Sequence, residues 1–242
     1  MLKLPIVSIL CAIIIFAIFD ILGSIDEKIE NNTILISKIN QYLKNQFCQY
    51  AEKCNSYKTL ESLCSLITKG TTPTTLKKSF TEEGIDFIKV ECLNDNHLLE
   101  LGKVAHIDNE THELLKRSKL QYKDFLISIA GTIGRFALLP KIIKQANTNQ
   151  AVAILRTKSL PQEYLYAVFN SGYCDEQIKS KTVQAVQANL SLSVIGSLEV
   201  PLIEDLDFYS TLADFYAKIE NLYETNLKLQ EMKTLYLKKF FG

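Results

Sequence analysis

Lys28-Ile29-Glu30-Asn31 and Lys218-Ile219-Glu220-Asn221 repeat one tetrapeptide near the two ends of the chain, and this repeat decides how the fold is organised. Around each copy, apolar residues recur at alternating steps of three and four, which is the pattern of a coiled-coil seam. One asparagine interrupts each seam, Asn32 in the first and Asn226 in the second, and a polar seam position commonly fixes helix register. The apolar seam positions are Leu22, Ile25, Ile29, Ile36, Ile39 and Leu43 in the first copy, and Leu212, Phe215, Ile219, Leu222 and Leu229 in the second.

We predict that these segments form two long helices that pair as an antiparallel, coiled-coil-like rod. Each helix should run for about 30 residues, or ~45 Å at 1.5 Å per residue. A proline precedes each helix, Pro5 in the first case and Pro201 in the second, and we expect both to mark the exit from a globular domain. The residues expected to hold the rod together and to meet partners are Ile25, Ile29, Ile36, Ile39, Phe215, Ile219, Leu222 and Leu229.

The segment between the helices has the sequence pattern of a mixed α/β domain. Residues 125–130 are β-rich, end in Gly131-Thr132-Ile133-Gly134 and continue as residues 135–139, which predicts a hairpin with a glycine turn. Further strands are expected at 84–90 and 151–155, and helices at 60–67 and 163–170. The predicted class is α+β, divided into residues 1–54 (apolar N-terminus and first spacer helix), 55–205 (the mixed domain) and 206–242 (second spacer helix).

The 27 Lys and Arg residues balance the 27 Asp and Glu residues, so bulk charge does not point to a nucleic-acid partner. The distribution is uneven, because residues 125–162 hold five cations and no acid. Lys69, Lys77 and Lys78 lie in a second acid-free run, and Lys179 and Lys181 in a third. Such runs can present a basic face to phosphates, or can be ordinary solvated surface, and charge alone leaves both interpretations open.

The N-terminal stretch Leu4–Phe19 carries no charge and resembles a signal peptide or a short anchor. It is shorter than the ~20 apolar residues that span a bilayer. We interpret it instead as the start of the first helix, left uncovered because a preceding domain is missing. The alternative is a membrane-anchored coiled-coil scaffold, which would need detergent for extraction.

Motifs for catalysis and for metal binding are absent from the sequence. There is no GxGxxG, GxxxxGK[ST], HExxH or GxSxG, and no Asn/Asp-Pro-Pro-aromatic tetrad of the kind that holds a flipped base. The six cysteines form no CxxC, and the three histidines form no HxxxH. We therefore predict a non-enzyme without metal or cofactor, and scattered thiols that fit a reducing cytoplasm.

Five strings follow one another between the two helices: residues 65–73 (SLITKGTTP), 84–89 (GIDFIK), 122–134 (YKDFLISIAGTIG), 147–154 (NTNQAVAI) and 187–191 (QANLS) followed by Val200-Pro201-Leu202. In this order they resemble the target recognition domain of the specificity subunit of type I restriction-modification systems. The resemblance covers nearly the whole chain from about residue 20 onward. The family's usual subunit carries two recognition domains and this chain has one, so the resemblance implies a half-subunit.

The resemblance implies that the domain reads one half of a split double-stranded DNA site and that the paired helices set the gap to the other half. Methyltransferase subunits would dock on the helices and methylate adenine, and a restriction/translocase subunit would cleave. A second recognition domain would come from another copy of the chain or another half-subunit. Such a reader needs cations for phosphates, and amide or guanidinium groups for base edges. The expected DNA contacts are Lys69, Thr72, Thr74, Lys77, Lys78, Arg135, Lys179, Lys181, Gln184 and Gln187.

Structural roles remain open at several of these places. Gly131 and Gly134 fit turn glycines better than a phosphate cradle. Asn149 and Gln150 fit a loop cap beside a strand better than a DNA contact. Residues 71–75 are equally consistent with a plain surface turn.

Overall fold

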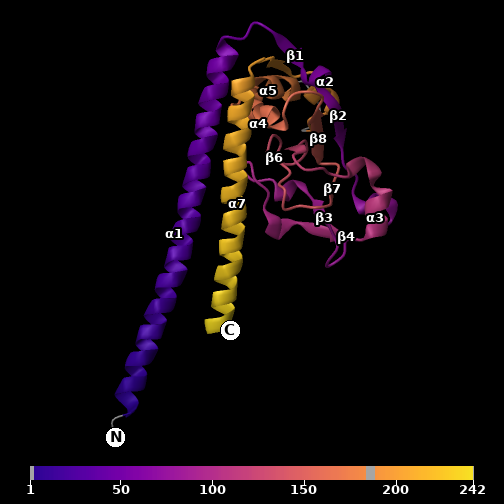
Figure 1. The fold of residues 1–242 in the computed structure, drawn as a ribbon. Helices are drawn as coiled ribbons and strands as arrows, with labels where there is room; N and C mark the ends of the chain where they lie inside the picture. Colours follow the sequence, from indigo (N-terminus) through magenta and orange to yellow (C-terminus); the bar gives the residue numbers. More distant parts are fainter. Residues whose placement is uncertain (1–2, 184–188, 242) are drawn as a thin grey trace. The chain divides into compact units, whose positions relative to one another are not determined.

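A computed structural model of the chain describes residues 3–183 and 189–241. It divides into two compact units, one formed by Met1–Ile39 with Ala217–Gly242 and the other by Asn40–Tyr216. Helix α1 (Lys3–Glu52) and helix α7 (Leu206–Phe241) contribute to both units, which are described in turn (Figure 1).

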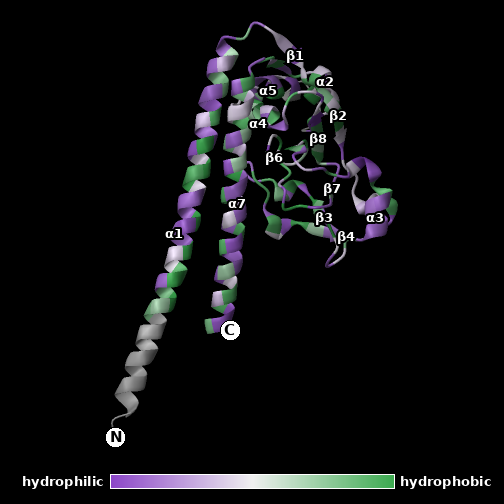
Figure 2. Ribbon diagram, in the orientation of Figure 1, coloured by the Kyte–Doolittle hydropathy of each residue, from purple (hydrophilic) through white to green (hydrophobic). Residues whose placement is uncertain are grey.

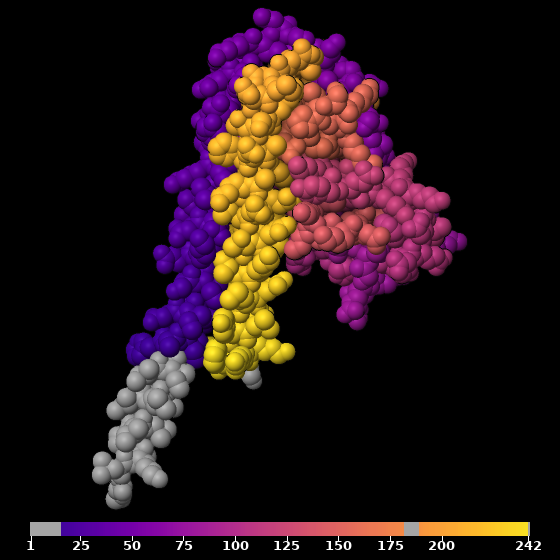
Figure 3. Space-filling view, viewed as in Figure 1, coloured from indigo at the N-terminus to yellow at the C-terminus, as the bar shows by residue number. Residues whose placement is uncertain are grey.

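The first unit is a pair of antiparallel helices. Over residues 16–39 and 217–241, α1 and α7 lie side by side (Figures 1 and 3), and apolar residues recur along both (Figure 2). Asn32 Nδ2 donates to Asn226 Oδ1 at 2.7 Å, and Lys233 Nζ lies 2.5 and 2.7 Å from the two carboxylate oxygens of Asp26. Asp26 precedes Asn32 on α1, whereas its partner Lys233 follows Asn226 on α7. The two helices therefore run in opposite directions, and the predicted antiparallel pairing is confirmed.

The seam is buried largely as the repeat predicts. Buried side chains in the first unit include Ile25, Ile36, Ile39, Ile219 and Leu222. Three other predicted seam residues are only half-buried: Ile29, Leu229 and, in the second unit, Phe215, whose ring lies 4.7 Å from that of Tyr42.

Both helices are longer than the predicted 30 residues. α1 has 50 residues and α7 has 36, which corresponds to ~75 Å and ~54 Å of helix. α1 already begins at Lys3, so the prediction that Pro5 precedes the helix is wrong. Proline is tolerated in the first turn, where its missing N–H would have no intrahelical partner.

The centre of the second unit is a four-stranded sheet in the order β2-β8-β5-β6. All three neighbouring pairs are antiparallel; β5 is buried at every position, and β8 is buried from Val152 to Leu155. The predicted glycine hairpin is therefore confirmed as β5 and β6. The strands are β2 (Cys64–Lys69), β8 (Val152–Thr157), β5 (Phe125–Ser128) and β6 (Phe136–Leu138).

Two smaller sheets flank the four-stranded one. One has the order β4-β3-β7, with β3 antiparallel to β4 and parallel to β7. The other is the antiparallel pair β1 and β9. Their strands are β3 (Ile85–Ile88), β4 (Ala105–Ile107), β7 (Ala146–Thr148), β1 (Tyr57–Thr59) and β9 (Glu199–Pro201).

Short helices complete the second unit. The helix expected at 163–170 is confirmed as α4, which buries Tyr164 and Tyr166 against the core. The helix expected at 60–67 is wrong: α2 ends at Leu63, and β2 follows because its backbone completes the ladder with β8. The helices are α2 (Leu60–Leu63), α3 (Asn109–Leu114), α4 (Gln162–Asn170), α5 (Asp175–Val183) and α6 (Leu192–Gly196), with 3-10 turns η1 (Pro73–Leu76), η2 (Val90–Cys92), η3 (Leu101–Lys103) and η4 (Lys116–Ser118).

Among the described residues, none of the helices is both long enough and apolar enough to cross a bilayer.

Candidate nucleic-acid interface

The four-stranded sheet brings three separate loops to one end, which we name the loop end. Lys69 at the end of β2 pairs with Ala153 near the start of β8, and Ser128 at the end of β5 pairs with Val152. The loop end thus comprises residues 69–78 after β2, residues 129–135 between β5 and β6, and residues 149–151 before β8. Three of the sequence strings singled out above meet here.

The loop after β2 is fixed to the chain that follows β7. Its Gly70 lies so close to Thr148 that an added Cβ would sit 1.9 Å from the Thr148 carbonyl oxygen. The backbone N–H of Thr71 donates to the same oxygen at 3.2 Å, and the Thr72 hydroxyl donates to the Gln150 side chain. These contacts hold the loop against residues 148–150 and leave Thr74 exposed.

Local sequence explains the turn itself. Pro73 occupies the first position of η1, where a fixed φ and a missing N–H cost nothing, and Thr72 precedes it in extended geometry. Lys77 ends the turn in the left-handed region, with φ 58°. This ending turns the chain so that Lys77 lies exposed on the surface.

A buried amide ties the neighbouring helices to this region. Asn147 on β7 is fully buried; its Oδ1 lies 2.5 Å from Nδ1 of His112 on α3. Its Nδ2 donates to the Leu115 carbonyl at 3.0 Å and to the Ser118 hydroxyl at 3.1 Å. A fully satisfied polar network of this kind fixes one arrangement of a core. It places η4 so that Arg117 reaches the loop end, 3.4 Å from the Thr71 hydroxyl.

The cations of the first loop differ in what they contact. Lys69 and Lys77 are exposed and form no ion pair with any residue in the described part of the chain. Lys78 instead pairs with Glu110 on α3 at 2.7 Å. Of the three lysines of this loop that are predicted to meet phosphate, two therefore have no ion-pair partner among the described residues.

Arg135 lies at the same end, directly after the glycine turn. Gly131 and Gly134 have φ of 73° and 91°, which explains why both positions are glycine. The turn is closed by the Gly134 N–H, which donates to the Ser128 carbonyl at 3.0 Å. The Arg135 guanidinium is paired with Asp95, on the loop after η2.

The remaining predicted contacts lie on or after α5. Lys181 Nζ donates to the carbonyl oxygen and hydroxyl of Ser197, and Lys179 is exposed on the same helix. Gln184 and Gln187 lie outside the described residues. The chain then reaches the loop end, because the Leu190 N–H donates to the Ile129 carbonyl at 2.9 Å.

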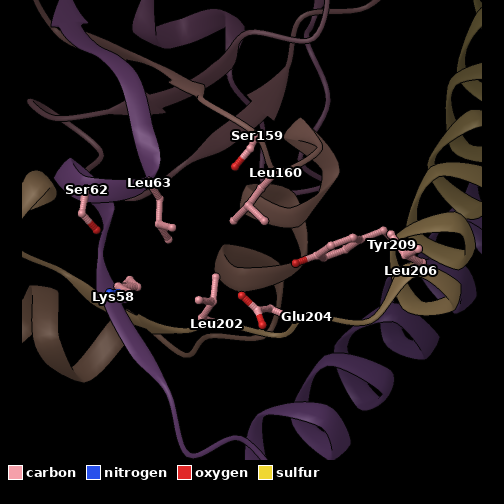
Figure 4. Close-up of a pocket in the computed structure, with 9 residues that line it drawn as sticks. All are labelled: Lys58, Ser62, Leu63, Ser159, Leu160, Leu202, Glu204, Leu206 and Tyr209. Atoms are coloured by element: carbon pink, nitrogen blue, oxygen red, sulfur yellow. The ribbon is translucent and has the colours of Figure 1, made fainter.

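The second unit also contains a cavity of about 500 Å³, shown in Figure 4. Its lining carries one ammonium and one carboxylate, on Lys58 and Glu204, among leucine side chains and hydroxyls. It borders Leu63 and Ser159, at the opposite end of β2 and β8 from the loop end. Across residues 3–183 and 189–241, His, Cys, Asp and Glu form no group of three or more that could hold a metal.

Several residues of this region were missed in the sequence. The sequence pattern gave Arg117 and Asn147 no binding role. Their partners, Thr71 and His112, are distant in sequence and come near only in the folded chain. Asp95 is forty positions from Arg135, so no local spacing connects them. The acid-free run and the glycine turn before Arg135 marked this place in the sequence, but neither points to Asp95.

Comparisons with known proteins agree with this architecture. The family model described as "Type I restriction modification DNA specificity domain" matches residues 52–231. The EcoBI specificity subunit of the type I restriction enzyme from Escherichia coli is 27% identical over 125 residues, which cover 50% of this chain and 26% of that subunit.

Solved structures share the fold at low identity. The S subunit of the type I system of M. genitalium superposes with a TM-score of 0.62 and 15% identity, over 93% of this chain and 60% of that one. A chain from a study of complex assembly and conformational transition of the type I R-M system superposes with a TM-score of 0.50 and 13% identity. The match covers 93% of this chain and 57% of that one. This chain thus spans less than two thirds of each of these relatives. Since the family model extends over most of the sequence, the chain belongs to the type I restriction-modification DNA specificity family.

Proposed function

We propose that this chain reads one half of a bipartite double-stranded DNA site and confers sequence specificity on a type I restriction-modification complex without catalysing a reaction itself. The observation that carries the proposal is the loop end. Three loops from distant parts of the sequence meet there, and the loop after β2 bears Lys69 and Lys77 as exposed cations that form no ion pair within residues 3–183 and 189–241. In a domain of the specificity family, such a surface fits the DNA backbone.

The groups at the loop end suit the two tasks of a DNA reader. Lys69, Lys77 and Arg117 supply point charges for phosphates, which set affinity and register. Gln150, Thr72 and Arg135 supply amide, hydroxyl and guanidinium groups for base edges. Strands lie ~4.8 Å apart, so the loops of β2 and β6 are separated by ~14 Å, comparable with a major groove ~12 Å wide.

The helices supply the surface for the other subunits. We propose that methyltransferase subunits dock on α1 and α7 and that the restriction/translocase subunit joins through them. The spacing between two half-sites would then follow from the length of the paired helices.

A second recognition domain would come from another copy of this chain. The seam between α1 and α7 does not supply the surface for such pairing, because Ile36 and Ile219 are already buried within one chain. The apolar surface still exposed on the same helices includes Phe16 at 71% and Leu235 at 67%. These residues, rather than the seam, are the surface that supports pairing.

Binding of the full chain to duplex DNA tests the proposal. The chain, alone and with a type I methyltransferase subunit, is titrated with a pool of random duplexes at several salt concentrations. We expect selection of a defined half-site and a log–log salt slope of several units, since each phosphate contact contributes about 0.9. Adenine methylation by the purified chain alone, or the absence of DNA binding under both conditions, would contradict the proposal.

A further inference from the structure

The Arg135 side chain is held by a carboxylate in a two-point geometry. Its Nε and Nη2 atoms donate to Oδ1 and Oδ2 of Asp95 at 2.7 and 2.9 Å. Nη1 lies 3.5 Å from the Leu93 carbonyl oxygen. The Asp95 side chain is 79% exposed, so the pair contributes little to stability. Its physical effect is orientation, because bidentate pairing fixes the plane of the guanidinium.

The loop that carries Asp95 is itself firmly built. Asn94 Oδ1 accepts hydrogen bonds from the N–H groups of Asn96 and Leu98, at 3.0 and 3.1 Å. The ring of His97 stacks on Phe136, the neighbour of Arg135, with 4.0 Å between centroids and 12° between planes. Burial lowers the pKa of His97 to about 4, so this ring is uncharged at neutral pH and does not repel the guanidinium. The loop therefore fixes Asp95 relative to Arg135.

The pairing leaves the Arg135 side chain 32% exposed. An arginine has five N–H donors, and the carboxylate takes the side that carries Nε. Nη1 also donates to the Leu93 carbonyl at 3.5 Å, and the donors of Nη1 and Nη2 that these contacts do not use suit a ligand with two adjacent acceptors. Guanine offers O6 and N7 in that arrangement in the major groove. The turn beside Arg135 is open, since a Cβ at Gly131 or Gly134 would meet nothing within 4 Å.

We propose that Asp95 is a positioning residue that presents Arg135 as a two-pronged reader of one guanine in the DNA half-site. The inference rests on the proposed DNA-reading function and adds the identity of one base and the residue that orients its reader. A phosphate also offers paired oxygens, but it would hold Arg135 without regard to sequence. Base preference, rather than affinity, is therefore the decisive measurement.

The experiment is selection from randomised duplex DNA with the full chain, comparing the wild type with three variants. Arg135→Lys keeps the charge and removes the fork. Asp95→Ala keeps the arginine and removes its support. Glu100→Ala is the matched control, because it also deletes a carboxylate from an exposed ion pair, with Lys103 at 2.5 Å. Thermal melting of each variant checks the fold, and Asp95→Asn replaces the alanine variant if that one does not fold.

We expect the wild type and Glu100→Ala to prefer guanine at one position by about 5- to 150-fold. Arg135→Lys and Asp95→Ala should lose that preference while binding non-cognate DNA with an unchanged salt slope. Retained preference in Arg135→Lys would make Arg135 a phosphate contact, and retained preference in Asp95→Ala would remove the positioning role. A wild type that selects no sequence would overturn the proposed function as well.

Discussion

At the scale of single residues, Gly70 is the position where the loop end tolerates no side chain. A Cβ there would lie 1.9 Å from the backbone carbonyl of Thr148, which cannot move away as a flexible side chain could. Gly70→Ala should therefore destabilise the second unit by about 1–3 kcal/mol and weaken DNA binding. Gly102→Ala is the control, since a Cβ there meets nothing within 4 Å, and should change stability by less than ~0.5 kcal/mol. Equal urea midpoints for the two variants would contradict the close packing of this loop.

Lys77 provides the test of a phosphate contact. It is exposed, has no acidic partner in the described residues and lies at the loop end. Lys77→Ala should weaken binding to all duplexes alike and reduce the salt slope by about 0.9. The control variant is Lys158→Ala. Lys158 is also exposed and follows β8 at the opposite end of the sheet, so this substitution should leave the salt slope unchanged. A change in base preference in Lys77→Ala would mean that Lys77 contacts a base and not a phosphate.

The sequence predicted only part of this surface. Runs without acidic residues singled out Lys69, Lys77 and Arg135, and the fold brings these segments, which are distant in sequence, to the same end of the four-stranded sheet. The network around Asn147 and the pairing of Arg135 with Asp95 could not be predicted, because each joins residues 29–40 positions apart through tertiary contacts. Hydrogen-bonding partners of that kind leave no periodic pattern.

At the scale of elements, the two interrupting asparagines form one buried pair. Asn32 and Asn226 bond to each other at 2.7 Å, and Asn226 Nδ2 also lies 3.4 Å from the Ile29 carbonyl and the Thr33 hydroxyl. Replacing either alone by leucine should cost about 1–3 kcal/mol, because the remaining amide stays buried without its partner. Replacing both should recover most of that loss. The measurement is a double-mutant cycle by urea unfolding.

The same pair is expected to select one helix register. Sedimentation of the double leucine variant should show mixed association states where the wild type shows one, since a uniformly apolar seam accepts several alignments. A single association state together with additive effects of the two substitutions would mean that the asparagines do not interact.

The elements were predictable to different degrees for physical reasons. Long helices leave a sustained seam, so both were expected, and only their ends were misjudged. The hairpin of β5 and β6 carries its own turn glycines and was equally readable. The segment from Leu60 to Ile67 is too short for periodicity to separate helix from strand, and pairing with β8 decided the matter.

At the scale of the whole molecule, the helix pair is proposed to set the gap between half-sites. Residues 33–39 and 219–225 face each other, and removing both sets deletes seven positions from each helix and keeps the seam in phase. Each helix shortens by ~10.5 Å, which should reduce the gap by about three base pairs. Removing only residues 33–39 should instead misalign the seam of α1 with that of α7 and abolish DNA methylation by the complex. If the matched deletion left the number of base pairs between the half-sites unchanged, the length of the helices would not determine the gap.

The central claim is that this chain supplies the sequence specificity of a type I complex. The most direct measurement maps methylated adenines in a host that expresses a type I methyltransferase subunit with and without this chain. We expect a new methylated site that appears only with the chain, interrupted by a fixed gap and with two identical half-sites, as a pair of copies related by two-fold symmetry requires. The same methylation pattern with and without the chain, or a continuous site, would contradict the claim.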